Sequence, residues 1–260
     1  MRERTQYSLL GGLSFLSPQH GFASNNIVSY QVVLSNGTIV NASRSVNSDL
    51  YFALQAGSTN FGIITSYDLL AYPQPLMWGG FRGYNISQSA TLVNDTIQMM
   101  KKQVNDTLAA GTAINWGRDA GAANDYVFQN YAYLNGSGPE TDIFDALLAV
   151  PSIPGSSTIR SNVDMQNLVA EIDDAFPGGP RSLFSTVTIK ADVQLPIDIY
   201  QKAHDNFAQL VTTNFSWTAS FQTLGVAVTS RIPQDFNPQG LTDKDGDLFC
   251  MYFLSFSQIE

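Results

Sequence analysis

The sequence predicts an α+β fold with two domains, the second built on an antiparallel sheet with helices on one face. Three observations predict it. Apolar residues make up 44% of the 260 residues and charged residues 13%, which is enough apolar material for a large core. Strand-like and helix-like segments follow one another without an internal repeat. A proline-containing stretch, 72–75, divides the chain, so we expect one domain over 1–74 and another over 75–260.

The first domain shows alternating strand and helix signals. An apolar run over 27–34 and a returning run over 38–42 flank Asn36-Gly37, which is a strong hairpin signal because both residues of a two-residue turn need positive φ. A short helix is expected over 48–55, and a β-rich run occupies 61–70.

The second domain has longer elements with clearer periodicity. Helices are expected where apolar residues recur on one face or where a proline stands in a first turn. The expected helices are 87–108, 142–149, 165–175 and 196–211. The expected strands are 77–84, 113–116, 125–134, 184–193, 217–228 and 247–256.

Charge and hydropathy exclude several classes of partner. The net charge is −9 and the pI is about 4.5, so the chain repels phosphate backbones and anionic lipid. No apolar run approaches the 18 residues or so of a membrane span. We therefore expect neither nucleic acid nor a membrane as a partner. The lone cysteine, Cys250, can form no internal disulfide, and its apolar neighbours indicate a buried thiol.

Asparagine usage favours a secreted glycoprotein. Seven Asn-x-Ser/Thr acceptors occur, about twice what chance pairing of such common residues gives, and several stand in polar, turn-like stretches. They are Asn36, Asn41, Asn85, Asn94, Asn105, Asn135 and Asn214. The alternative is a surface that is simply rich in these residue types.

Several segments match known phosphate- or metal-binding motifs only in part. The stretch Gly57–Gly62 has phosphate-loop spacing but lacks the Lys-Ser/Thr that follows in such loops. The aspartates of 243–247 lack the glycine and the glutamate of a calcium loop. No metal site is expected. His204 stands beside the apolar stripe of the 196–211 helix, where a structural histidine is the better interpretation.

Paired and spaced glycines mark the informative region. Glycine has no Cβ, so Gly11, Gly12, Gly57 and Gly62 allow the backbone to approach a flat or phosphorylated ligand closely. On chemistry alone, an equally good interpretation is that these glycines only shape turns.

Three ordered blocks settle the choice between these interpretations. They are Gly11-Gly12-Leu13-Ser14-Phe15-Leu16-Ser17 with Gly21–Val28, the hairpin 32–40, and Asn47–Leu54 with Gly57–Thr65. Together they cover about 65 residues. In order and spacing they resemble the second half of the flavin domain of the vanillyl-alcohol-oxidase/PCMH-type superfamily, specifically fungal berberine-bridge-like oxidases.

The resemblance implies an FAD-dependent oxidoreductase. It would oxidise a small alcohol, sugar or secondary metabolite by hydride transfer to the flavin, with dioxygen as the acceptor. Phe221 and Gln222 would lie on the substrate sheet and face the substrate. The catalytic base stays unknown. The implied cofactor-binding residues are Gly11, Gly12, Leu13, Gly21, Asn26, Asn60, Gly62 and Ile63.

Departures from the family pattern temper this expectation. Asn25 replaces the usual aspartate and Ser48 the usual proline. The family's phosphate-binding loop and its flavin-linking histidine lie before the position of Gly11, and its closing segment follows the last residues here. We therefore expect a fragment, the back half of the flavin domain and a substrate domain incomplete at its C-terminus. Two alternatives remain: a catalytically inactive remnant, or an extracellular glycan-binding glycoprotein.

Overall fold

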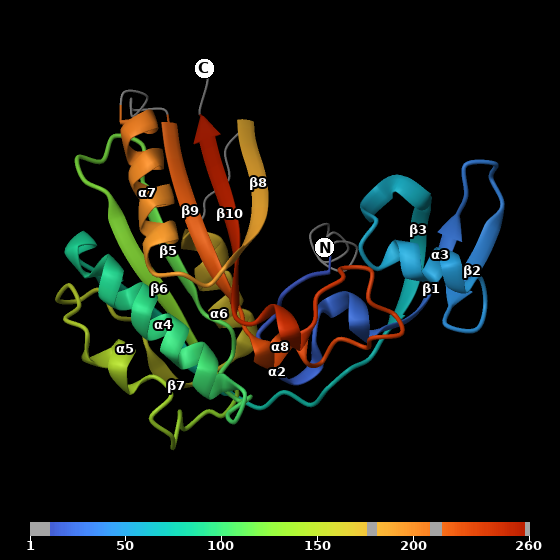
Figure 1. The fold of residues 1–260 in the computed structure, drawn as a ribbon, viewed down its shortest axis with the longest axis horizontal. Coiled ribbons are helices and arrows are strands. Elements are labelled where there is room, and N and C mark those ends of the chain that lie inside the picture. Colours follow the sequence, from blue (N-terminus) through green and yellow to red (C-terminus); the bar gives the residue numbers. More distant parts are fainter. Residues whose placement is uncertain (1–10, 176–180, 209–214, 258–260) are drawn as a thin grey trace. The chain divides into compact units, whose positions relative to one another are not determined.

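The computed structural model describes residues 11–175, 181–208 and 215–257, which form two compact units. The first unit comprises Met1–Gln74 and Val226–Asp245, and the second comprises Pro75–Gly225 and Gly246–Glu260. The main division follows Gln74. The return of Val226–Asp245 to the first unit differs from the expected continuous second domain. Figure 1 traces the chain through both units.

A small antiparallel sheet organises the first unit. Its strand order is β2-β1-β3, and side chains from β1, β2 and α3 bury its core around Tyr30, Val32 and Tyr51. The strands are β1 Ile27–Val33, β2 Ile39–Ser43 and β3 Ile63–Leu69. The helical elements are α2 Ser17–His20, η1 Ala23–Asn26, α3 Ser48–Leu54, η2 Ser58–Phe61, α8 Val226–Thr229 and η4 Asp243–Asp245.

The β1–β2 hairpin forms as predicted, but its turn is of another type. Gly37 has φ +81°, whereas Asn36 does not have positive φ. The N–H of Gly37 donates to the carbonyl of Leu34 and the N–H of Leu34 donates to that of Thr38, both at 2.9 Å. This is a three-residue loop that places a single glycine in the left-handed region, so the prediction of two positive-φ residues was wrong.

One large antiparallel sheet forms the second unit. Among the described residues seven strands align in the order β7-β4-β6-β5-β9-β10-β8. The strands are β4 Met77–Tyr84, β5 Ala113–Arg118, β6 Tyr126–Tyr133, β7 Arg160–Val163, β8 Arg181–Lys190, β9 Phe215–Leu224 and β10 Leu248–Ser257. The helices are η3 Ile86–Gln88, α4 Ser89–Gln103, α5 Asp145–Ala149, α6 Met165–Ala175 and α7 Gln194–Phe207.

Helices α4 and α7 cover one face of this sheet (Figure 1). The core lies under them, where Trp116 of β5 stacks on Tyr200 of α7 at 6.0 Å between ring centroids. Alternate residues of every strand point to the opposite face, as the pleat requires. The fold is therefore the α+β arrangement with an antiparallel sheet that the sequence predicts.

The observed elements differ from the expected ones in several places, of which three are the clearest. Helix α4 stops at Gln103 and not at 108, because its last turn runs into the Asn105–Asp106 turn. Strand β9 ends at Leu224, and the following residues form α8. Strand β7 was missed, because its four residues are mostly polar and exposed and so lack an apolar alternation.

Candidate cofactor site

The Gly11–Asn26 segment of the first unit folds into a tight loop. Gly11 and Gly12 have φ +94° and +79°, a backbone that only glycine adopts without strain. The carbonyl of Gly12 accepts from the N–H of Ala23 at 2.8 Å, and that of Gly11 accepts from the N–H of Ser24 at 2.9 Å. Both carbonyls are therefore used within the protein.

The backbone N–H donors of the same loop make no hydrogen bonds within the described residues. Within the part of the chain that the structure describes, the N–H groups of Gly12 and Leu13 have no hydrogen-bond partner. Buried or half-buried backbone donors nearly always find one in native proteins. Successive N–H groups in such a turn form a concavity suited to the acceptor atoms of a ligand. The loop thus presents two adjacent donors.

Asn26 holds this loop in shape. Its Nδ2 donates to the carbonyls of His20 and Phe22, at 2.9 and 2.8 Å. Its Oδ1 accepts from the hydroxyl of Tyr72 at 2.7 Å, and the Tyr72 ring stacks on His20 with centroids 3.6 Å apart. Asn26 therefore supports the loop through its side chain, and Gly21 lies at the end of α2 in the same turn.

A buried polar cluster lies beside the loop, and sequence reasoning missed it. Gln239, from the returning segment, donates through Nε2 to the Ser24 hydroxyl at 3.2 Å and to the Gln55 carbonyl at 3.3 Å. Nε2 of Gln55 donates to the carbonyl of Ser24 at 3.3 Å. A Cβ on Gly11 would stand 3.4 Å from Nε2 of Gln239, so the amide lies directly against the loop. Single glutamines in loops carry no sequence signal.

This cluster contains acceptors without donors. The side-chain oxygens Oε1 of Gln55 and Oε1 of Gln239 are buried and have no partner in the described structure, although Gln55 is only 1% exposed. An unsatisfied buried polar atom costs roughly 1–3 kcal/mol. Donors and acceptors that lack partners therefore stand around one loop.

Three other predicted cofactor residues lie elsewhere. Asn60, Gly62 and Ile63 precede or begin β3, where Ile63 pairs with Val33 at the far end of β1 from Asn26. Six residues of strand separate the two ends, which is roughly 20 Å. Asn60 is exposed and donates through Nδ2 to the Gly57 carbonyl at 2.9 Å, and Ile63 is 71% exposed. The structure does not bring this group to the Gly11–Gly12 loop.

The two predicted substrate-facing residues lie on opposite faces of β9. Phe221 is fully buried under the helices, in edge contact with Trp116 and Phe249. The prediction that Phe221 faces the substrate was wrong, because strand alternation sends neighbours to opposite sides and its ring completes the core. Gln222 points to the face away from α4 and α7 and is half-buried, with Cys250 opposite it on β10.

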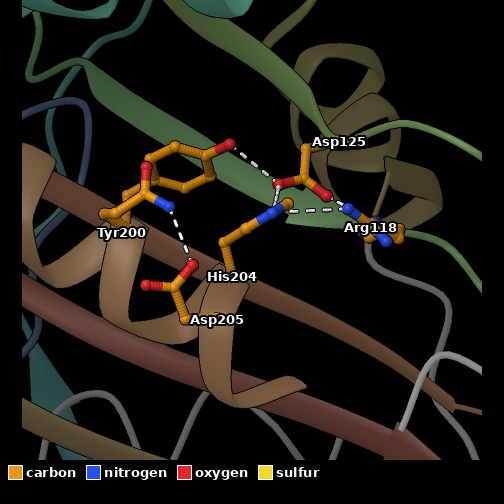
Figure 2. Close-up of polar contacts among 6 residues, drawn as sticks. Arg118, Asp125, Tyr200, His204 and Asp205 are labelled. Carbon is orange, nitrogen blue, oxygen red and sulfur yellow. Dashed lines mark hydrogen bonds and ion pairs between the residues drawn. The ribbon is translucent and has the colours of Figure 1, made fainter. Parts of the chain in front are cut away.

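A compact group of charged residues lies between α7 and the β5–β6 hairpin of the second unit, as Figure 2 shows. Asp125, 5% exposed, accepts at Oδ1 from Nε of Arg118 (2.5 Å) and at Oδ2 from the Tyr200 hydroxyl (2.8 Å) and Nδ1 of His204 (2.6 Å). Burial alone would raise the pKa of Asp125, but these three hydrogen bonds outweigh it and lower the pKa. A carboxylate so occupied is a poor base, so the group joins α7 to the β5–β6 hairpin, in keeping with a structural His204.

The sequence is similar to fungal FAD-dependent monooxygenases. It is 29% identical over 252 residues to drtC of Aspergillus calidoustus, covering 95% of this chain and 47% of that protein. It is 34% identical over 199 residues to tpcD of Cochliobolus heterostrophus, covering 74% of this chain and 37% of that protein. No protein-family model matches the chain.

Solved structures share the fold. The chain aligns with 6-hydroxy-D-nicotine oxidase of Arthrobacter nicotinovorans at a TM-score of 0.67 and 17% identity, over 97% of this chain and 54% of that one. It aligns with xylooligosaccharide oxidase of Myceliophthora thermophila C1 at 0.63 and 23%, over the same shares.

The fold is that of FAD-linked oxidases, and sequence relates the chain to fungal FAD-linked oxidoreductases of the PCMH, berberine-bridge-like type, as its motifs predicted. The chain spans between about a third and a half of the length of the first two relatives.

Proposed function

We propose that this chain is part of an FAD-dependent oxidoreductase that oxidises a small alcohol, sugar or secondary metabolite, with dioxygen as the final acceptor. The observation that carries the proposal is the pattern of backbone hydrogen bonds at Gly11–Leu13. The carbonyls of Gly11 and Gly12 accept hydrogen bonds within the protein, whereas the N–H groups of Gly12 and Leu13 have no partner in the described residues. Such donors fit the acceptor atoms on the rim of a flavin or on its diphosphate. The relatedness to FAD-dependent enzymes supports the same cofactor.

In this proposal the first unit binds the cofactor and the second unit contacts the substrate. Bound FAD supplies a two-electron acceptor for the substrate's hydride. Gly12 and Leu13 would bind it through their N–H groups, and Asn26 fixes the shape of the loop. In the second unit, the sheet face that carries Gln222 would contact the substrate through amide and hydroxyl groups.

Proton removal from the substrate needs a base, and this face limits the choice. Among its described strand positions no aspartate or glutamate occurs, and its phenols are Tyr126 and Tyr252. Burial raises the pKa of Tyr126, whose hydroxyl lies 2.7 Å from that of Thr218, so Tyr126 keeps its proton. Gln222 can orient a substrate hydroxyl but cannot accept its proton at neutral pH.

The test is flavin retention by the purified chain. The 260 residues are produced in a secretory host, and the visible spectrum is recorded after dialysis and after added FAD is removed by gel filtration. Flavin bands that stay with the protein support the proposal. A folded, colourless chain would favour the second candidate, a flavin-free remnant.

The chain is further proposed to follow the secretory route and carry N-linked glycans. Of the acceptors within the described residues, Asn36, Asn41, Asn85, Asn94 and Asn105 are exposed and Asn135 is half-buried. Asn214 lies outside the described residues. In three acceptors the asparagine Oδ1 accepts from the N–H of the Ser or Thr two positions later, at 3.0–3.2 Å, so this bond does not use the amide nitrogen. A loss of mass on endoglycosidase treatment of the protein from its own host would support this. An unchanged mass would contradict it.

A further inference from the structure

Strand β8 forms one end of the seven-stranded sheet (Figure 1). Among the described residues it pairs with β10 alone, over all ten of its positions, and every residue of β8 except Ile189 is exposed. Native proteins usually protect the end strand of a sheet by making it short, charged or irregular. Strand β7, at the other end, has four residues and a left-handed backbone at Asn162, φ +55°. Strand β8 is long, and its segment 182–189 contains no charged residue, proline or glycine.

The exposed side chains of β8 include three large apolar ones. Leu183 is 63% exposed, Phe184 60% and Val187 50%. Leu183 and Val187 lie on the face that α4 and α7 cover elsewhere, because Val187 faces Met251 of the core across β10. Phe184 lies on the opposite face, where its ring stacks on Tyr252. Such an edge, with apolar side chains on both faces, is suited to pairing with a further strand.

The backbone limits how two copies of this edge can pair. Successive residues of a strand direct their N–H and C=O groups alternately to one side and to the other. The outward groups of β8 therefore belong to every second residue, and an identical edge presents the same set. Two copies can form antiparallel ladder hydrogen bonds only where odd-numbered residues face odd-numbered ones and even-numbered residues face even-numbered ones. The twofold axis of such a pair is perpendicular to the sheet, so both helix layers lie on the same side.

One register of this kind makes the exposed side chains complementary. With the axis at Ser185, Leu183 of each copy faces Val187 of the other, so both exposed aliphatic side chains are covered. On the opposite face Phe184 faces Thr186, and the two Phe184 rings are diagonal neighbours, which aromatic side chains are long enough to bridge. An axis at Phe184 or at Thr186 would set Leu183 or Val187, respectively, against the hydroxyl of Ser185.

We infer that β8 is an edge for self-association, to which a second copy of this chain adds its own β8 antiparallel, with the twofold axis at Ser185. The pairing joins the two seven-stranded sheets into one. Arg181 faces Ile189 of the second copy, so no like charges meet along the paired length. Each favourable contact occurs twice, once on either side of the axis. The inference does not depend on flavin binding.

The first test is the oligomeric state of the purified 260-residue chain, measured by sedimentation equilibrium over a range of concentrations. A monomer–dimer equilibrium is expected. Hydrogen exchange of the β8 amides should slow as the dimer forms, whereas exchange at β7 should not change. A chain that stays monomeric up to about 0.1 mM would overturn the inference. Growth beyond the dimer would also overturn it, because a twofold contact closes. Neither measurement needs a variant that could misfold.

A charged substitution then tests the edge. Val187→Lys places a cation opposite Leu183 and diagonal to Arg181, twice in each dimer, and is expected to raise the dimer dissociation constant roughly tenfold or more. Val28→Lys is the matched control, because Val28 of β1 is 49% exposed and Val187 is 50% exposed. It should leave the dissociation constant unchanged. Equal weakening by the two substitutions would be a general effect of charge and would overturn the inference.

A double variant tests the register. In Leu183→Glu/Val187→Lys each new carboxylate faces the new ammonium group of the other copy. Within one strand the two positions are roughly 13 Å apart, so they cannot form the ion pair there. The double variant is therefore expected to recover most of the association that Val187→Lys loses. An association that is not recovered would overturn the twofold axis at Ser185.

Discussion

Nδ1 of His204 lies 2.6 Å from Oδ2 of Asp125, although 79 residues separate them in the chain. The contact joins α7 to the loop that precedes β6, and Arg118 completes it from the end of β5 (Figure 2). Three elements of the second unit thus meet at one carboxylate.

Replacing that carboxylate should destabilise the second unit. Asp125→Asn keeps the shape but leaves the guanidinium of Arg118, 13% exposed, without its counter-charge. Removing one partner of a buried pair typically costs about 3 kcal/mol or more. We expect a loss of that size in the free energy of unfolding, measured by urea denaturation. Asp119→Asn, at an exposed position in the same hairpin, is the control and should change it by less than about 0.5 kcal/mol. Equal effects of the two would contradict this account.

The same carboxylate should make stability depend on pH in the acid range. Its pKa is lowered in the folded chain, so the unfolded chain takes up the proton first as the pH falls. The stabilisation is therefore complete above about pH 4, where the unfolded carboxyl is ionised, and is lost as the pH falls through the lower folded pKa. The difference in unfolding free energy between wild type and Asp125→Asn should shrink from pH 5 towards pH 2 or so. A difference that stays constant over this range would refute the assignment.

Gly62 is expected to tolerate no side chain. Its φ is +142°, and an added Cβ would stand 2.6 Å from the carbonyl oxygen of Val33 and 2.7 Å from Cγ1 of Val32. Gly62→Ala should cost roughly 2–4 kcal/mol through strain and overpacking. Hydrogen exchange of the β1 and β3 amides reports it directly. Gly37→Asn is the matched control, since nothing lies within 4 Å of a Cβ there and Asn accepts a left-handed backbone. Unchanged exchange in Gly62→Ala would show that the β1–β3 contact adjusts.

Cys250 should react slowly as long as the protein is folded. Burial raises the pKa of its thiol, more than the hydrogen bond with Thr188 lowers it, so less thiolate is present at pH 8. We expect its reaction with a disulfide reagent to be roughly tenfold or more slower than that of free cysteine. Full reactivity should return in concentrated guanidinium chloride. Fast reaction in the native state would show that β10 is open to solvent at this point.

Local signals explain what could be predicted from the sequence. The hairpin around Gly37 and the left-handed backbone at Gly11-Gly12 could be predicted because glycine adopts positive φ without strain, although Asn36 does not share that conformation. Strand β9 of the large sheet could be predicted because apolar and polar residues alternate along it over 215–222.

Side-chain contacts between residues far apart in the chain could not be predicted from the sequence. The residues around Gln239 give no sequence signal that its side chain contacts Ser24. Asp125 stands in a loop, where its contact with His204 cannot be told from the pattern of an ordinary turn aspartate. Phe221 and Gln222 show the same limit within one strand: the pattern says that they face opposite sides, but only the packed helices decide which side is the core. Side-chain roles that depend on such contacts follow from the tertiary structure and cannot be predicted from the sequence alone.

The return of Val226–Asp245 to the first unit has a consequence for synthesis. The amide of Gln239 cannot meet Ser24 until 215 further residues have left the ribosome, which takes roughly 10–40 s at ordinary translation rates. Throughout that interval the nascent first unit lacks α8 and the amide that braces its glycine loop, while the strands from β4 to β9 are emerging. The timing of elongation, and any chaperone that holds the early segment, thereby becomes part of how the Gly11–Leu13 loop acquires its shape.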